Sequence, residues 1–265
     1  MDKKEFESVE KLYHYTNMES AKAILNNKTL LSNQLKNMND INELYRPKFY
    51  DIGINLDDSI EEEVRKEIGK YQQISLTHDG CRMGFDIPAM WGHYADKGNG
   101  VCIILDKMKL LETISKDKRI VANAPIKYSS PSKFSPAVFL KTDVCGVIKS
   151  FSNSQLKEFF LHKTNDWSYE QEYRILLKTD TDERQKLDIS NSLLGIIMHN
   201  SKSAKDKGAP LKDSEEFIEL KEYINEDKIL AYASFLDERN LTKARQLLSE
   251  SIWSSKNYNE IIGMI

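Results

Sequence analysis

Three charged side chains interrupt a run of strand-forming residues in the stretch Trp167-Ser168-Tyr169-Glu170-Gln171-Glu172-Tyr173-Arg174. In an extended strand over residues 169–178, Glu170, Glu172 and Arg174 point to one face. The opposite face is mostly apolar and carries Tyr169, Gln171, Tyr173, Ile175 and Leu177. Ion pairs are a costly way to hold a strand in place, so this pattern indicates a functional site. The alternative is an exposed strand whose charges form cross-strand ion pairs.

The size and composition of the chain are those of a soluble globular protein. Its 265 residues suffice for one large domain, or for one domain with a small appendage, and for a buried core. Hydrophobic residues make up 40% and charged residues 30%, which argues against a disordered chain. A net charge of −3 gives no general attraction to a polyanion, so any nucleic acid binding would be local.

Neither the cysteines nor the hydropathy of the chain indicates secretion or a membrane span. The widely separated Cys81, Cys102 and Cys145 form no disulfide framework and are expected to be reduced thiols in the core. No segment approaches the roughly 20 apolar residues that span a bilayer, and residues 1–10 are mixed in charge without an apolar stretch. We therefore expect a cytoplasmic protein that makes no membrane contact.

Strands and helices follow one another irregularly over the first 200 residues. Residues 12–16 are predicted to form a strand, and Asn17 to cap a helix that ends at Asn26-Asn27. Asp86 is predicted to cap a short helix that contains Met90, Trp91 and Tyr94. Long polar insertions and few regular crossovers predict a mixed α+β domain rather than a doubly wound sheet.

Beyond Asn200 the pattern indicates helices alone. We expect them at about residues 214–225, 227–236 and 241–253. We accordingly divide the chain into an α+β domain over residues 1–205 and a helical C-terminal extension over residues 206–265. This extension is expected either to pack against the domain or to mediate contacts with a partner protein.

The motifs of four common enzyme classes are absent from the sequence. It contains no Gly-rich Walker loop, no dinucleotide-binding glycine pattern after a strand, no His-Glu-x-x-His helix and no Gly-x-Ser-x-Gly elbow. His78 and Cys81 have the spacing of a metal-binding pair. Because no second pair stands at a useful distance, we predict no metal site.

Polar and aromatic groups near the predicted strand ends remain as candidates. They lie in Leu12-Tyr13-His14-Tyr15-Thr16, Asn39-Asp40-x-x-Glu43, Met90-Trp91-Gly92-His93-Tyr94-Ala95, Gly100-Val101-Cys102-Ile103 and Trp167-x-Tyr169-Glu170-x-Glu172-x-Arg174. Together these motifs resemble an uncharacterised bacterial family that is regarded as a distant relative of the ADP-ribosyltransferase superfamily. The first strand, helix, strand and polar loop resemble that superfamily, including its DNA-modifying bacterial toxins of the DarT type. The resemblance covers about residues 11–200.

The resemblance implies a split, strongly bent antiparallel sheet with flanking helices that clamps NAD+ in a cleft. It implies that Glu172 is the catalytic carboxylate, that Glu170 orients or deprotonates an acceptor, and that His14 hydrogen-bonds the nicotinamide ribose. Arg174 would hold a pyrophosphate oxygen or neutralise the two acids. The residues assigned to NAD+ binding are His14, Tyr15, Thr16, Asn39, Asp40, Trp91, Tyr94 and Arg174.

The chemistry of NAD+ cleavage fits paired carboxylates without reference to the family. Breaking the bond between ribose and nicotinamide makes an oxocarbenium-like centre, whose charge a fixed carboxylate stabilises. Nicotinamide leaves without needing a strong acid.

Several of these residues also suit purely structural roles. His14 lies between two tyrosines, as a hydrogen-bonded core histidine would. Trp91 and Tyr94 have the spacing of core aromatics on an amphipathic helix. His162 has no partner pattern, and we assign it no role.

We expect an enzyme that transfers ADP-ribose from NAD+ to an unidentified macromolecule or hydrolyses NAD+. The superfamily implies a bacterial toxin or an antiphage effector as its biological role. Two alternatives remain open: an ADP-ribosyltransferase directed at DNA or RNA, and a non-catalytic module that binds a nucleotide or a partner.

Overall fold

The computed structural model describes residues 8–35, 66, 69–130, 160–198, 215–223 and 229–232. The chain forms two compact units, each of which is described by itself. Unit 1 consists of Met1–Thr29, Leu76–Thr113 and Asp188–Ile265, and unit 2 of Leu30–Ser75 and Ile114–Leu187. The boundary predicted near residue 205 lies outside the described residues.

Unit 1 is built on a sheet of apolar strands. In the order β12-β11-β5-β1-β4, these are β12 (Ile229–Tyr232), β11 (Leu193–Met198), β5 (Val101–Asp106), β1 (Lys11–Thr16) and the last residues of β4 (Tyr71–His78). They pair antiparallel, except that β11 and β12 are parallel. Every residue of β5 and β11 is buried, as expected for strands that read as near-continuous apolar runs.

The helix after β1 begins where the sequence predicts. Asn17 caps α2 (Met18–Asn27), and its side-chain oxygen accepts a hydrogen bond from the backbone N–H of Ser20 at 2.8 Å. The strand predicted over residues 12–16 is β1, one residue longer at its amino end. Both predictions are confirmed because they rest on local signals, the alternation of side chains and a capping residue.

The short helix that carries Trp91 starts after a different residue from the one predicted. It is α5 (Pro88–Tyr94), and the residue at its N-cap is Ile87, which makes no side-chain capping bond. The predicted cap at Asp86 is therefore wrong. Pro88 in the first turn lacks a backbone N–H, so a side-chain cap has one donor fewer to satisfy there.

The C-terminal region contains a strand as well as helix. The helix α10 (Glu215–Glu222) matches the one predicted at 214–225. Residues 229–232 form β12, parallel to β11, so the helix predicted over 227–236 is wrong. A short apolar run cannot be assigned to helix or strand by periodicity alone, and pairing with β11 decides the matter. The helix predicted at 241–253 lies outside the described residues.

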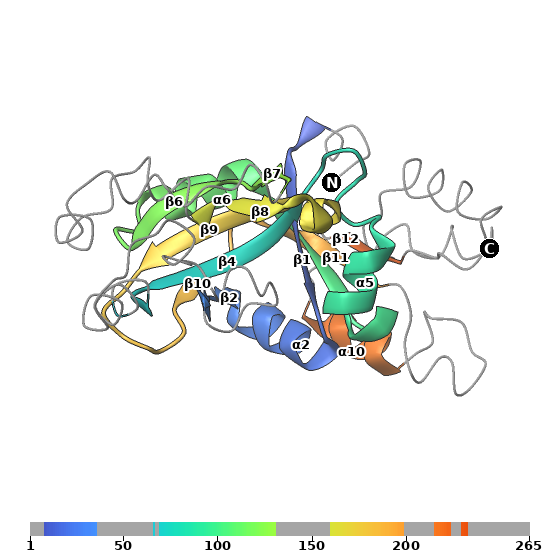
Figure 1. Ribbon diagram of the computed structural model, residues 1–265. Coiled ribbons are helices and arrows are strands. Elements are labelled where there is room, and N and C mark those ends of the chain that lie inside the picture. Colours follow the sequence, from blue (N-terminus) through green and yellow to red (C-terminus); the bar gives the residue numbers. More distant parts are fainter. Residues whose placement is uncertain are drawn as a thin grey trace, which may run out of the picture. The chain divides into compact units, whose positions relative to one another are not determined.

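Unit 2 contains the Glu-rich segment. In the order β3-β4-β9-β6, its strands are β3 (Asn33–Gln34), the first residues of β4, β9 (Glu172–Lys178) and β6 (Ile120–Pro125). Figure 1 shows β6, in green, alongside β9, in yellow, and the two pair antiparallel. A separate pair of parallel strands is formed by β7 (Lys127–Ser129) and β8 (His162–Thr164).

The core of unit 2 is aromatic and aliphatic. It is formed by Leu35, Tyr71, Phe160 and Leu176. The rings of Tyr71 and Phe160 lie 4.8 Å apart between centroids.

The remaining elements of the two units are β2 (Thr29–Leu31) and β10 (Lys186–Asp188), which pair with each other, α6 (Lys107–Ser115), and the 3-10 helices η3 (Asp96–Gly98) and η6 (Asn165–Glu170).

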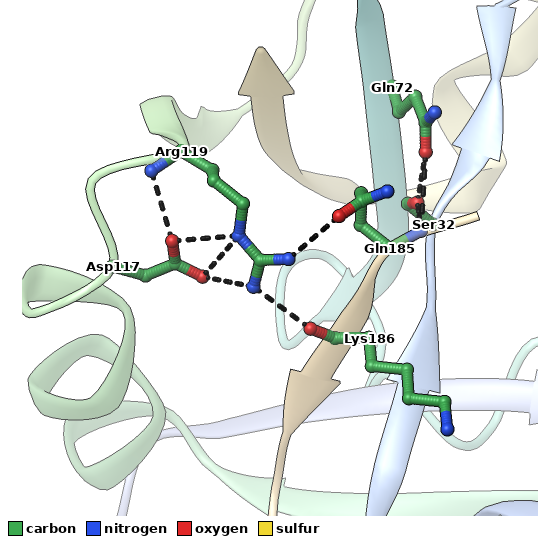
Figure 2. A network of polar contacts seen from close by, with 6 residues as sticks. All are labelled: Ser32, Gln72, Asp117, Arg119, Gln185 and Lys186. Carbon is green, nitrogen blue, oxygen red and sulfur yellow. Dashed lines mark hydrogen bonds and ion pairs between the residues drawn. The ribbon is translucent and has the colours of Figure 1, made fainter. Parts of the chain in front are cut away.

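A polar network in unit 2 joins segments that are distant in the sequence. Figure 2 shows its members, Ser32, Gln72, Asp117, Arg119, Gln185 and Lys186. The guanidinium of Arg119 donates to the carboxylate of Asp117 at 2.6 Å, to the side chain of Gln185 at 2.9 Å and to the carbonyl of Lys186 at 3.0 Å. The buried Ser32 hydroxyl donates to the Gln72 side chain and accepts the backbone N–H of Gln185 at 2.7 Å. These side-chain bonds add to the backbone bond that the N–H of Ser32 donates to the carbonyl of Gln185 at 2.9 Å.

The described residues form a mixed α+β protein with a mainly antiparallel sheet, as the sequence predicts. Whether this sheet is of the ADP-ribosyltransferase type stays a prediction. No helix in the described ranges is long and apolar enough to cross a membrane.

Candidate functional site

The charged residues of the Glu-rich segment form a buried network in unit 2. Arg174 donates from Nε to Oε1 of Glu172 at 2.8 Å and from Nη2 to Oε2 at 2.9 Å. Lys163 lies 2.8 Å from Oε2 of Glu172 and 2.8 Å from Oε2 of Glu170. Glu170 is 4% exposed, Glu172 2% and Arg174 1%. The predicted alternative of an exposed strand with cross-strand ion pairs is therefore wrong, because the charges are buried and Glu172 pairs along its own strand.

Glu170 reaches the network from a turn rather than from a strand. Residues 165–170 form η6, and Gln171 follows with φ 45°, in the left-handed region. The strand β9 begins only at Glu172, so the prediction of a strand from residue 169 is wrong at its first three positions. Although the two glutamates do not alternate along one strand, the sharp turn at Gln171 still brings both carboxylates to one lysine.

Lys163 is the centre of the network. It lies in β8 and is buried, with its side chain held by the two carboxylates. Its Nζ also lies 5.4 Å from the centroid of the Trp167 ring. A buried lysine is rare unless it is paired, and two carboxylates with an aromatic ring meet that requirement.

Backbone and hydroxyl contacts fix the position of Glu172. Its N–H donates to the hydroxyl oxygen of Tyr128 at 2.9 Å, and its carbonyl accepts the N–H of Ile126 at 2.8 Å. Burial is the main cause that raises the pKa of Tyr128, so this hydroxyl stays neutral. The Arg174 guanidinium is anchored as well, because Nη1 donates to the carbonyl of Phe160 at 2.6 Å.

The carboxylate of Glu172 is ionised despite its burial. Burial alone raises the pKa of a carboxyl group, but the charges and hydrogen bonds of Arg174 and Lys163 outweigh it and lower the pKa of Glu172 to about 2. The two cations and the two carboxylates balance in charge. The arrangement therefore holds the ionised carboxylate of Glu172 between two cations.

Two of the predicted site residues of unit 1 lie together in an aromatic cluster. The rings of Tyr15 and Trp91 are 5.2 Å apart and almost perpendicular, at 89°. The Tyr15 hydroxyl donates to the carbonyl of Gly84 at 2.7 Å, and Trp91 Nε1 donates to the carbonyl of Phe85 at 2.8 Å. Burial raises the pKa of Tyr15. Both polar groups are thus satisfied within the core, as the structural interpretation of Trp91 predicts.

His14 and Thr16 belong to the other face of β1, because side chains alternate along a strand. His14 is half-buried and Thr16 is buried, while Tyr94 is half-buried on α5. Asn39 and Asp40 lie outside the described residues. His14 is in unit 1 and Glu172 in unit 2, and their convergence on one NAD+ molecule stays a prediction.

Sequence reasoning missed Lys163 and Tyr128. Lys163 precedes Glu170 by seven positions, and a 3-10 helix lies between them. The periodicity of a helix or strand therefore does not predict that their side chains meet. The Tyr128 hydroxyl accepts the backbone N–H of Glu172, which lies 44 positions later in the sequence. The one sequence feature that points to Lys163 is its place between His162 and Thr164 in a short run typical of a strand. This feature does not predict that the lysine is buried.

Metal binding finds no support within the part of the chain that the structure describes. There, no three or more His, Cys, Asp or Glu side chains gather in an arrangement that could hold a metal ion.

The segment from α5 to β9 contains Trp91 and the whole network around Glu172. Residues 90–175 match a family described as "Protein of unknown function (DUF2971)". The matched segment starts at Met90, the first residue of the Met-Trp-Gly-His-Tyr-Ala motif, and ends one residue after Arg174. No match was found among curated proteins or among solved structures. The matched segment thus includes the charged network, and the description of the family names no activity for it.

Proposed function

We propose that this chain uses NAD+ as a substrate and transfers ADP-ribose to a macromolecule, or to water, with Glu172 as the catalytic carboxylate. The observation that carries the proposal is the position of the Glu172 carboxylate, 2.8 Å from Arg174 Nε and 2.8 Å from Lys163 Nζ, because these two cations keep it ionised and lower its pKa to about 2. A carboxylate that stabilises an oxocarbenium-like centre must carry its charge before the bond breaks. Glu172 meets that requirement at every physiological pH.

The neighbours of Glu172 suit the remaining parts of the reaction. Glu170 forms an ion pair with Lys163, which also pairs with Glu172. When Lys163 moves away, Glu170 can take a proton from the hydroxyl group that receives ADP-ribose. Lys163 and Arg174 are the cations that would attract the pyrophosphate of NAD+. Nicotinamide leaves as a neutral molecule, so the site needs no general acid.

Movement of η6 is the change that would admit substrate, because its residues Glu170 and Trp167 both contact Lys163 beside Glu172. Glu172 is buried and both its oxygens are engaged, so a ribose can approach only if a covering segment shifts. In η6, Asp166 and Ser168 are exposed, and Trp167 and Tyr169 are half-buried.

A second candidate is the non-catalytic module that binds a nucleotide or a partner. The observation in its favour is the complete pairing of Glu172 with Arg174 and Lys163, which resembles a structural ion cluster. In that case the network holds β8, η6 and β9 together and never contacts a nicotinamide ring.

One experiment separates these candidates. The full chain is incubated with NAD+ labelled in the ADP-ribose moiety, with and without cell extract, and free nicotinamide is measured together with label in protein, DNA and RNA. We expect nicotinamide release by the wild-type chain and label in a single class of macromolecule. Label in DNA or RNA would select the nucleic-acid-directed enzyme.

The matched pair of variants is Glu172→Gln and Glu183→Gln, because Glu183 is exposed in the same unit. Glu172→Gln should abolish release and Glu183→Gln should not change it. Glu170→Gln, which leaves Glu172 paired with Arg174, should reduce transfer to the acceptor more than nicotinamide release. Absence of nicotinamide release by the folded wild-type chain would reject the enzyme in favour of the binding module.

A further inference from the structure

A serine and a histidine that the proposed function does not use meet in unit 2. The Ser129 Oγ lies 2.6 Å from Nε2 of His162, at hydrogen-bonding distance. Both residues are half-buried. They come together because β7 and β8 are parallel, with Lys127 opposite His162 and Ser129 opposite Thr164.

The two faces of this strand pair have different roles. Side chains alternate along a strand, so Tyr128 and Lys163, which are partners in the register, share one face. That face contacts Glu172, through the Tyr128 hydroxyl and the Lys163 ammonium group. Ser129, His162 and Thr164 belong to the opposite face.

A second hydroxyl on that face, that of Thr164, is left without a partner. Thr164 is 8% exposed, and its Oγ1 makes no hydrogen bond within the described structure. Thr164 immediately precedes η6, at the N-cap position, yet its side chain makes no capping bond. A buried hydroxyl without a partner is unfavourable, so its retention beside Ser129 indicates a ligand oxygen that completes it.

We propose that Ser129 is a nucleophile that accepts an acyl group from an activated ester, with His162 as its general base and the Thr164 hydroxyl as a hydrogen-bond donor to the carbonyl oxygen. Nε2 of His162 takes the hydroxyl proton while Oγ bonds to the carbonyl carbon. The bond between that carbon and the leaving oxygen then breaks, and His162 returns the proton to the leaving group. Water, deprotonated by His162, later releases the acid and restores Ser129.

This reactivity is tested with the full chain and two probes, p-nitrophenyl acetate for turnover and a fluorophosphonate ester for trapping. In the trapping reaction Oγ bonds to phosphorus, fluoride leaves, and the proton passes to His162. We expect one adduct, which peptide mapping assigns to Ser129. The labelling rate should fall in acid, because a protonated imidazole cannot accept the hydroxyl proton of Ser129.

The variants are Ser129→Ala, His162→Gln and Thr164→Val, with the adjacent Ser130→Ala as the matched control. Ser129→Ala should lose the adduct and Ser130→Ala should keep it. Glutamine can accept the serine hydrogen bond but not its proton, so His162→Gln should label about 100-fold more slowly. Thr164→Val should slow acylation about tenfold without lowering the melting temperature, because no hydrogen bond is lost.

An adduct at another residue, no adduct in the folded wild-type chain, or equal rates in the wild-type chain and His162→Gln would each overturn the proposal. These results are independent of nicotinamide release, because neither probe contains NAD+.

Discussion

Arg174 binds both carboxylate oxygens of Glu172, two positions earlier in the same strand, at 2.8 and 2.9 Å. Both side chains lie on one face of β9 because they are separated by two residues, and the strand spacing lets the planar guanidinium match the carboxylate. Together with Lys163, Arg174 keeps Glu172 in its ionised state.

The stability of the chain should depend on acid pH through Glu172. Its folded-state pKa, about 2, lies below the ordinary value of 4.5, so the unfolded chain binds the proton more readily. The resulting stabilisation is fully present above about pH 4.5 and is lost as the pH falls through the folded pKa. We expect a loss on the order of a few kcal/mol, measured by urea unfolding at a series of pH values. A Glu172→Gln variant whose pH profile matches that of the wild-type chain would contradict this assignment.

Nicotinamide release, if Glu172 is catalytic, should not decline through loss of its charge between about pH 8 and pH 5. The reason is that a carboxyl group with a pKa of about 2 stays ionised over that range. Initial rates in a buffer series measure this. An acid limb centred near the ordinary carboxyl value of 4.5 would show that the reacting carboxylate is not held by Arg174 and Lys163.

Removal of both partners of the buried pair should cost less than the sum of the two single removals. Arg174→Met leaves an ionised carboxylate with one cation fewer, which we expect to lower the free energy of unfolding by about 3–5 kcal/mol. The double variant with Glu172→Gln should lose less than the sum of the single losses. Chemical unfolding of the four chains completes a double-mutant cycle, and additive losses would mean that the two side chains do not interact.

Ser32→Ala should destabilise unit 2. The substitution leaves the backbone N–H of Gln185 without this acceptor and the Gln72 side-chain oxygen without this donor, at a buried position. We expect a loss of about 1–3 kcal/mol in urea unfolding. The exposed Ser190→Ala is the control and should change stability by less than about 0.5 kcal/mol. Equal effects of the two substitutions would indicate that the network in Figure 2 contributes nothing.

Asn17→Ala should weaken the start of α2. Alanine cannot accept the backbone N–H of Ser20, and loss of a side-chain cap costs about 1 kcal/mol. Asn17→Asp should retain the stability, because a carboxylate also caps a helix and its charge suits the N-terminal end. Thermal unfolding of the two variants measures the difference. A loss of equal size in both would point to a role of the amide group outside the helix.

The parts of the fold that were predicted correctly rest on local signals. Alternation of side chains is enough for β1, and one capping residue is enough for the start of α2. The parts that were predicted wrongly depend on distant residues. The run at 229–232 becomes a strand only because β11 lies beside it, and residues 169–171 leave the strand because Gln171 adopts a left-handed conformation.

The candidate site shows the same division. Glu170, Glu172 and Arg174 were identified from their types and spacing, and the structure brings them together. Lys163 was missed because the 3-10 helix η6 separates it in the sequence from its partners Glu170 and Glu172. His162 had no partner in the sequence, and Ser129 lies beside it, 33 positions away along the chain.

The sequence by itself determined the local elements around Asn17 and the identity of the charged groups near position 172, because periodicity, capping and side-chain chemistry act within a few residues. Only the tertiary structure decided that these charges are buried, that Lys163 pairs with both acids, and that Ser129 meets His162. The physical reason is that burial and pairing depend on which strands lie beside one another, and that is set by packing between segments far apart in the chain.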